Sequence, residues 1–413
     1  MLYLKPILYV SAAAVLSASA GAAIVISNNH APNAAVNIQD KKPAAGSTRS
    51  NSDDSSRGRE AGAERKIEID ENVVKAVDKG LKWLADRQTS NGTWEATVGF
   101  KLNNSYQFDD EVRGRGDVGV TALAGMAFLA NGQVPGRGKY GNVINKTLDY
   151  ILSCQQGNGY ITSHGSRMYS HAFSTLFLAE LLGMVKRDDV REKLEDAVRL
   201  IVDSQNTQGG WRYVPFASES DMSITVCQVM ALRAARNVGI PVPRATIDRA
   251  VKYVKDSAVR DSGNSSGWGS GDERGAFRYQ AHVYSRATFP LTAAGIVTLN
   301  GAGIYSDRDV EEGLDYLEKE LESFSKQYGE AYSTSDQGHY FFYYGHYYAV
   351  QAMYTAAGSR WDNYYKYIKK MLLRMQRSDG SWPNNVGPGD AFGTATATLI
   401  LEIPFRFLPI FQR

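Results

Sequence analysis

The chain has 413 residues, 43% of them hydrophobic and 22% charged, and its 46 basic residues nearly balance its 44 acidic ones. Because the lysines and arginines are dispersed, there is no electrostatic footprint for nucleic acid, and we expect no nucleic-acid partner. The two cysteines, Cys154 and Cys227, form no CxxC motif and no cluster with histidine, which excludes a disulfide scaffold and the usual structural zinc sites.

The first 29 residues contain the one strong targeting signal. Residues 7–26 are almost wholly apolar, and Lys5 is the only charged residue before them. This length suffices to span a bilayer. A cleavable signal peptide is the alternative, because Ala18-Ser19-Ala20 has the small-residue pattern that signal peptidase accepts. We favour an N-terminal transmembrane helix, because the apolar run continues past that site. In either case we expect the remaining chain on the periplasmic or extracytoplasmic side of the membrane.

Residues 30–66 form a segment of different composition, rich in Ala, Ser, Asn, Asp, Lys and Arg and nearly free of large apolar residues. Such a segment cannot offset its ordering entropy by burial. We therefore predict a disordered linker that joins the membrane segment to a folded domain at residues 67–413.

Within residues 67–413 a two-part unit recurs: a helix, a loop with Gln, Gly and an aromatic residue, and a second helix rich in Ala, Thr and Leu. The clearest loops follow the pattern Gln-x3-Gly-x-Trp and begin at Gln88, Gln205 and Gln376. A weaker copy begins at Gln155. Two degenerate copies are expected around Tyr253 to Gly267-Trp268 and around Tyr316 to Gly329.

The second helix of each unit has apolar residues at the helical period on more than one side, which is typical of an inner layer. The first helices are charged on one face, as in "REKLEDAVRLIVDSQ", which is typical of an outer layer. About six such pairs, each unable to bury its apolar face alone, predict an all-α fold, a closed α/α toroid. The expected inner helices span residues 118–129, 170–182, 223–235, 287–299, 346–356 and 394–402.

The Gln-x3-Gly-x-Trp loops resemble the QW repeats of the squalene-cyclase and protein-prenyltransferase β-subunit superfamily. Stretches such as "GGWRYVPFASESDMSITVCQVMALRAA" and "YYGHYYAVQAMYTAAG" are similar to bacterial, exported prenyltransferase/squalene-oxidase repeat proteins. The resemblance covers roughly residues 73–413. It is specific for the fold and carries little information about an activity.

In squalene-type cyclases the resemblance implies an acidic DxDD motif whose middle Asp protonates a polyene. The matching stretch here places Asp221 at that position, with Met222 in place of the last Asp and Glu219 available to tune the acid. The alternative is that Asp221 caps the following helix, because Asp is a preferred N-cap residue. We weight capping above catalysis.

In prenyltransferase β subunits the resemblance implies zinc held by an Asp-x-Cys pair and a later His. The matching positions are Asp221, Ser223 and His346, and serine in place of cysteine removes the thiolate ligand. Zinc-dependent protein prenylation is therefore disfavoured, and we expect no metal and no cofactor.

Aromatic residues are dense between residues 340 and 348. Their ring faces suit a carbocation or an isoprenoid tail, whereas the alternative is packing of one hairpin against the next. Other polar residues lie where the inner helices begin, at Asp117, His171, Arg286 and Asp390, and would converge if these helix ends share one mouth. Each alone is also a common cap or surface charge. The candidate ligand-binding residues are Tyr344, His346, Tyr347, Tyr348, Trp211, Tyr213, His171, Arg286 and Asp117.

Two functions follow from these patterns. The leading interpretation is a membrane-tethered toroid that binds an apolar, isoprenoid-like or extended ligand, or a partner protein, in its central cavity, without assigned catalysis. The alternative is a terpenoid cyclase-like enzyme with Asp221 as general acid and Glu219 as its partner.

Overall fold

The computed structural model describes residues 70–96, 115–261, 272–328, 341–384 and 388–411. The expected transmembrane or signal segment and the linker lie outside these ranges, as do Gly267, Trp268 and Gly329. Within these ranges no helix is long and apolar enough to cross a membrane.

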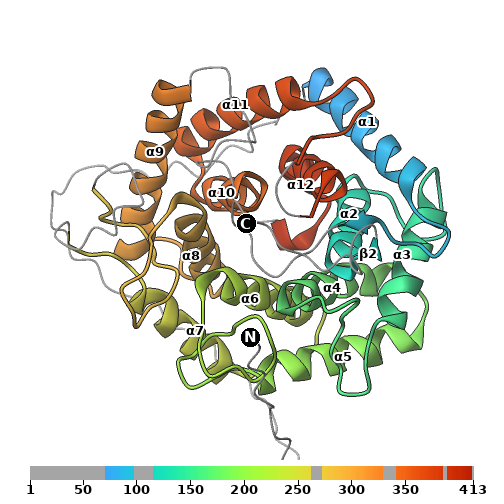
Figure 1. Ribbon diagram of the computed structural model, residues 1–413, viewed down its shortest axis with the longest axis horizontal. Coiled ribbons are helices and arrows are strands. Elements are labelled where there is room, and N and C mark those ends of the chain that lie inside the picture. Colours follow the sequence, from blue (N-terminus) through green and yellow to red (C-terminus); the bar gives the residue numbers. More distant parts are fainter. Residues whose placement is uncertain (1–69, 97–114, 262–271, 329–340, 385–387, 412–413) are drawn as a thin grey trace, which may run out of the picture. The chain divides into compact units, whose positions relative to one another are not determined.

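Twelve helices of the described residues form two concentric rings (Figure 1). Each inner helix contacts the next inner helix along the chain, and α12 contacts α2, so the inner ring is closed. This arrangement confirms the predicted α/α toroid. The inner helices are α2 (Val118–Ala130), α4 (Met168–Leu181), α6 (Met222–Asn237), α8 (Phe289–Gly301), α10 (Phe342–Ala356) and α12 (Asp390–Glu402).

The outer ring consists of the first helix of each pair. Its members have one buried face and one solvated face, whereas every residue of α2 in the inner ring is buried. Two short strands, β1 (Glu95–Ala96) and β2 (Arg115–Gly116), pair antiparallel beside the rings. The outer helices are α1 (Glu71–Arg87), α3 (Gly141–Ser153), α5 (Asp188–Asp203), α7 (Arg244–Asp256), α9 (Arg308–Tyr328) and α11 (Gly358–Met375).

The glutamine of each clear loop joins its own loop to the next outer helix. Gln88 Nε2 donates to the Gly92 carbonyl at 3.1 Å and to the Val143 carbonyl of α3 at 2.9 Å. Gln376 Nε2 donates to a carbonyl of α1, so the last loop of the chain holds the first helix and closes the outer ring. The corresponding bonds are Gln155 to Lys193, Gln205 to Thr246 and Gln376 to Ala76.

The glycine of each loop lies against the backbone of that next helix. Gly380 has φ +95°, and a Cβ atom there would lie 2.5 Å from the Lys79 carbonyl oxygen of α1. Only glycine tolerates both the left-handed backbone and the close approach. The tryptophan indoles complete the loops by donating to the end of the preceding outer helix: Trp94 to Leu84, Trp211 to Ile201 and Trp382 to Leu372.

The degenerate copy between α7 and α8 is at a different position from the one expected. Gly275, with φ +85°, takes the role of the loop glycine, because its Cβ would lie 2.2 Å from the Glu312 carbonyl oxygen of α9. Phe277, two residues later, takes the role of the tryptophan. Its backbone N–H donates to Thr292 Oγ1 of the inner helix at 3.1 Å, and the Trp382 N–H donates to Thr394 Oγ1 at 3.0 Å in the same way.

Gly380→Ala should destabilise the domain by about 2 kcal/mol or more, because it strains the backbone and pushes the last loop away from α1. Gly183→Ala is the matched control, because a Cβ at Gly183 would meet nothing within 4 Å and its φ is not positive. Urea unfolding of both variants checks this. Equal unfolding free energies for the two would contradict the role given to the loop glycine.

Candidate functional site

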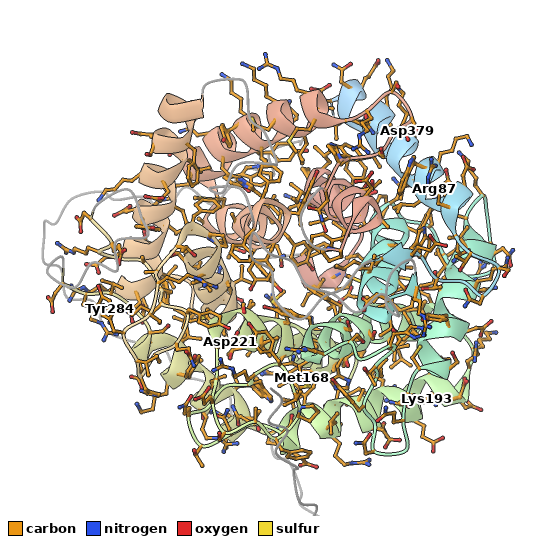
Figure 2. All side chains as sticks on the ribbon, in the orientation of Figure 1. Arg87, Met168, Lys193, Asp221, Tyr284 and Asp379 are labelled. Atoms are coloured by element: carbon orange, nitrogen blue, oxygen red, sulfur yellow. The ribbon has the colours of Figure 1, made fainter. Side chains whose placement is uncertain are left out.

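Asp221, which is labelled in Figure 2, is the N-cap of α6. It is fully buried. Its Oδ1 accepts hydrogen bonds from the Ile224 N–H at 2.9 Å and from Ser223 Oγ at 2.6 Å. The Tyr279 hydroxyl donates to Oδ2 at 3.3 Å. The capping geometry expected from the sequence is therefore present, together with a side-chain hydroxyl on each carboxyl oxygen.

Burial raises the pKa of the Asp221 carboxyl above its ordinary value, although the hydrogen bonds from Ser223 and Ile224 oppose this shift. The environment thus favours the protonated form more than water does. A buried carboxyl of this kind can donate a proton or a hydrogen bond at a pH where an exposed aspartate cannot.

Four tyrosines surround Asp221 and Ser223 at the end of the ring where the inner helices begin. The hydroxyls of Tyr213 and Tyr279 lie 2.6 Å apart, and the Tyr169 hydroxyl donates to Ser223 Oγ at 2.6 Å. The Tyr344 hydroxyl donates to the Ser223 carbonyl at 3.2 Å. All four side chains are partly exposed. We call this end of the ring, with these four tyrosines and Asp221, the N-terminal mouth.

At the mouth and one helical turn further along the inner helices, aromatic side chains from opposite sides of the ring meet in its lumen. Helices α4 and α10 lie opposite one another in the inner ring of helices. Aromatic side chains of the two helices are in contact at two levels. The centroids of Tyr169 and Tyr344 are 6.4 Å apart, and those of Phe173 and Tyr347 are 6.2 Å apart, both edge to face. These pairs bridge the lumen from wall to wall.

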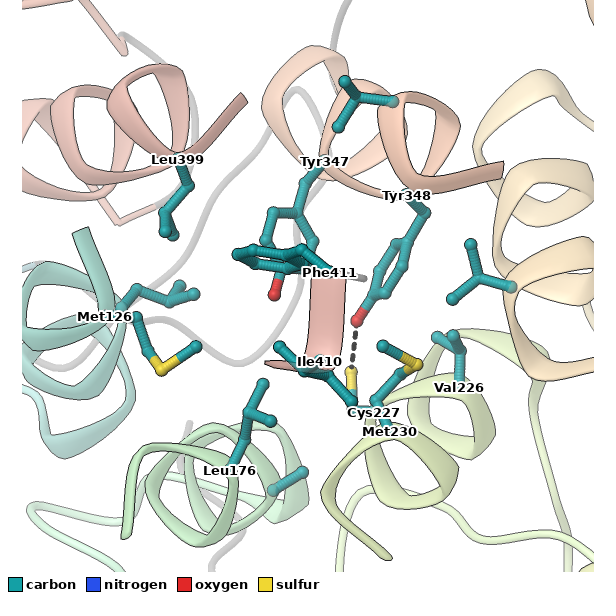
Figure 3. Close-up of a cluster of buried hydrophobic side chains, with 14 of the residues drawn as sticks. Met126, Leu176, Val226, Cys227, Met230, Tyr347, Tyr348, Leu399, Ile410 and Phe411 are labelled. Carbon is teal, nitrogen blue, oxygen red and sulfur yellow. Dashed lines mark hydrogen bonds between the residues drawn. The ribbon is translucent and has the colours of Figure 1, made fainter. Parts of the chain in front are cut away.

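The lumen is also entered from its other end by the last described segment, the 3-10 helix η6 (Pro409–Phe411). Figure 3 shows Ile410 and Phe411 between the inner helices, and both are almost fully buried. The Phe411 ring is 6.3 Å from that of Tyr347. The chain therefore fills part of its own lumen. The other labelled apolar residues around this segment are Met126, Leu176, Val226, Met230 and Leu399.

Glu219 does not reach Asp221, and its predicted role as a tuning partner is corrected. Its side chain is 60% exposed and pairs with Arg212, with 2.5 Å between Arg212 Nη1 and Glu219 Oε2. Asp221 instead accepts from the first turn of α6 as its N-cap. The hydroxyls of Ser223 and Tyr279 occupy the positions where the sequence pattern suggested a carboxyl partner.

The two candidate histidines lie between the rings. Both nitrogens of His171 bond to backbone, with Nδ1 accepting from the Ile161 N–H and Nε2 close to the Ala197 carbonyl, each at 3.1 Å. Burial lowers the pKa of His171 to about 4, so it is neutral at pH 7. His346 Nδ1 is 2.9 Å from the Tyr364 hydroxyl of α11. His171 and Trp211 thus connect loops to outer helices and His346 connects α10 to α11, and we leave all three out of the site.

The remaining candidates lie at helix starts. Asp117 caps α2 by accepting from the Val120 N–H at 2.9 Å, and burial raises its pKa. Arg286 lies over the Tyr279 ring, with Cζ 4.7 Å from its centroid, and so belongs to the mouth. Asp390 pairs with Arg377.

The candidate Tyr348 lies within α10 and not at a helix start. Its hydroxyl is 3.1 Å from Cys227 Sγ (Figure 3).

Sequence reasoning missed Tyr169, Tyr279 and the supporting part played by Ser223. The signal for Tyr169 was its position as the second residue of an inner helix, where a phenol can reach the mouth. Tyr279 lies in an irregular loop and had no periodic signal. Among the described residues, no group of three or more His, Cys, Asp or Glu side chains is placed to hold a metal ion.

The fold places the chain among the two-ring α/α toroids. Residues 175–360 match the squalene-hopene cyclase C-terminal domain family, which confirms the resemblance to the squalene-cyclase and prenyltransferase superfamily. No curated protein matches the chain.

Solved structures share the fold at low sequence identity. The type II terpene cyclase MstE from Scytonema is 12% identical, with a TM-score of 0.53 over 82% of this chain and 99% of that one. An α-1,6-mannanase from Salegentibacter is 10% identical, with a TM-score of 0.54 over 80% and 98%. A protein from Actinoplanes is 15% identical, with a TM-score of 0.51 over 80% and 98%. These likenesses extend to the fold alone, because one toroid hosts different chemistries.

Replacing Asp221 separates capping from acid chemistry. Asp221→Asn keeps an oxygen acceptor for the Ile224 N–H, whereas Asp221→Ala leaves that donor and two hydroxyls without their acceptor. We expect Asp221→Ala to lower the free energy of unfolding by about 1–2 kcal/mol more than Asp221→Asn does. Chemical denaturation measures both, and equal losses would contradict the cap.

Glu180, beside the inserted C-terminal segment, should make stability depend on pH. Burial raises its pKa from 4.5 to about 7, partly offset by the Ile410 N–H and by Arg233. The folded state therefore holds the proton more tightly, and stability falls as pH rises from about 4.5 to about 7. Over that pH window, the free energy of unfolding of Glu180→Gln should rise relative to that of the wild type by on the order of 3 kcal/mol.

Unfolding free energies measured at pH 4.5, 6 and 7.5 test this, with the exposed Glu192→Gln of α5 as control. A Glu180→Gln difference that stays constant across the three pH values would show that Glu180 is not held protonated by its surroundings.

Proposed function

We propose that the domain is a binding toroid, which takes an extended ligand or a partner segment across its N-terminal mouth and performs no cyclisation in its lumen. The observation that carries this proposal is the pair of wall-to-wall aromatic contacts between α4 and α10. A cyclase needs room for a folded polyene next to its acid. Here Phe173 and Tyr347 meet in the lumen where the polyene would have to lie. Ile410 and Phe411 fill the other end of the lumen.

The features of the mouth support binding. Its four tyrosines are partly exposed, hold fixed hydrogen-bonded positions, and lose little conformational entropy when they contact a ligand, because a tyrosine side chain has only two rotatable angles. They come from α4, α10 and two separate loops. A ligand at the mouth would thus contact several repeats at once.

The tether remains part of the proposal. The N-terminal apolar segment would hold the domain at the membrane, with the linker as spacer, on the extracytoplasmic side.

A terpenoid cyclase is the second candidate, favoured by one observation. Asp221 is buried, its pKa is raised, and phenol rings surround it, as protonation of a carbon–carbon double bond would require. MstE is described as a type II terpene cyclase in complex with geranylgeranyl dihydroxybenzoate, its substrate. Against this candidate stand the outward position of Glu219 and the bridged lumen.

Incubation of the protein with squalene and with geranylgeranyl diphosphate, followed by mass spectrometry of the extracted lipids, tests the proposal. We expect no cyclic product above the protein-free control from the wild type or from Asp221→Asn. A cyclic product made by the wild type and lost in Asp221→Asn, at unchanged melting temperature, would establish the cyclase instead.

A further inference from the structure

The segment that follows α12 enters the lumen at the end opposite to the mouth. Arg406, between α12 and η6, has φ +60°, a left-handed conformation that is uncommon for any residue other than glycine. The helix η6 then places Ile410 and Phe411 between the inner helices, with only 2% and 6% of their surfaces exposed (Figure 3). We call η6 the plug.

The two rings are closed without the plug. In the inner ring α12 contacts α2, and in the outer ring Gln376 Nε2 donates to the Ala76 carbonyl of α1 at 2.8 Å. The Phe411 N–H donates to the Leu408 carbonyl, three residues earlier, so this hydrogen bond stays within the segment. Departure of the plug would therefore leave the contacts that close both rings intact.

One carboxyl group connects the plug to the ring. Glu180, near the end of α4, accepts a hydrogen bond from the Ile410 N–H, and its Oε2 is buried without a hydrogen-bond partner among the described residues. Burial raises the pKa of Glu180 to about 7. A carboxylate at this place lacks the hydrogen bonds that would replace its hydration, so ionisation of Glu180 disfavours the inserted plug.

The elements around Glu180 add few other charges. Arg233 of α6 attracts the carboxylate, and the pKa of Glu180 stays at about 7 in spite of this attraction. Tyr347 of α10 is close enough to feel the charge of Glu180, but burial raises the pKa of its phenol far above neutral. Helix α2 and the plug have no ionisable side chain, and no described residue of α5 shifts the pKa of Glu180.

We propose that η6 is a displaceable plug, which Glu180 holds in the lumen and whose departure opens a pocket at this end of the ring. The pocket would take a small apolar molecule, because the side chains around the plug are mostly apolar, among them Met126, Leu176 and Leu399 (Figure 3). This inference goes beyond the binding function proposed above, because it concerns the other end of the ring and does not depend on the ligand of the mouth.

Opening should follow the ionisation of Glu180. Its pKa is about 7 with the plug inserted and returns toward the ordinary 4.5 when the plug has left and water reaches the carboxyl. The inserted state therefore holds the proton more tightly, is favoured at pH 5.5 and is disfavoured as pH rises through 7. Between pH 5.5 and 8.0 the open fraction should increase by up to about 30-fold, and the affinity of a ligand for the pocket should increase in proportion.

Fluorescence titration of the full chain with N-phenyl-1-naphthylamine tests the proposal, because this apolar probe is uncharged at both pH values. We expect the wild type to bind the probe at least tenfold more tightly at pH 8.0 than at pH 5.5. Glu180→Gln is neutral at both pH values and should bind as weakly at pH 8.0 as the wild type does at pH 5.5. Glu192→Gln is the matched control, because Glu192 is exposed on α5, and it should keep the wild-type pH dependence.

A second variant should open the pocket without a change of pH. Phe411→Lys places a charge in the lumen and should expel the plug, so that at pH 5.5 it binds the probe at least as tightly as the wild type does at pH 8.0. Phe407→Lys is its matched control, because Phe407 is 54% exposed and a charge there stays in water. It should change the affinity less than about twofold.

Hydrogen–deuterium exchange of the wild type needs no variant. Exchange in the peptide that contains residues 408–411, corrected for the intrinsic effect of pH, should be faster at pH 8.0 than at pH 5.5. Equal corrected rates would contradict a plug that leaves the lumen.

The inference is also overturned if the wild type binds the probe equally at both pH values, if Glu180→Gln keeps the pH dependence, or if Phe407→Lys raises the affinity as much as Phe411→Lys. A loss of helical circular dichroism in step with probe binding overturns it as well, because the ring would then open as a whole. Failure of the binding function would instead be seen as cyclic product from squalene or geranylgeranyl diphosphate.

Discussion

The structure depends on one recurring contact, in which the loop that joins an outer helix to its inner helix is fastened to the backbone of the next outer helix. It is present in every such loop that the described residues include. The glutamine amide donates to a carbonyl there, and the glycine allows the two backbones to touch. At Gln376 and Gly380 the next helix is α1, some 300 residues earlier in the chain. The ring is therefore closed by the same contact that spaces its repeats, which protects both ends of the array from solvent.

Closure has a consequence for the lumen. Small residues let the inner helices approach one another, so the ring is narrow and residues on opposite helices can meet. Tyrosines and phenylalanines on α4 and α10 do so, and η6 fills the space beyond them. The inner helices also begin at one end, which brings the N-cap of α6 and the loops before α6 and α8 to a common mouth.

Asp221 combines two properties that the sequence presented as alternatives. Its carboxyl caps α6, and the same burial that makes the cap effective raises its pKa. A cap is not evidence against acid chemistry, and a raised pKa is not evidence for it. What would separate the two functions is the space beside the carboxyl, where the hydroxyls of Ser223 and Tyr279 donate to its two oxygens.

The sequence by itself determined the all-α class, the approximate number of repeats and the assignment of helices to inner and outer layers, because local periodicity and the Gln-x3-Gly-x-Trp pattern record contacts that recur along the chain. It also located Asp221, Tyr213, Tyr344 and Arg286. Only the tertiary structure decided that Glu219 turns outward, that His171 and His346 serve the interface between the rings, and that Tyr169 and Tyr279 join the site. These outcomes depend on irregular loops and on helices that meet across the ring, and neither leaves a periodic trace in the chain.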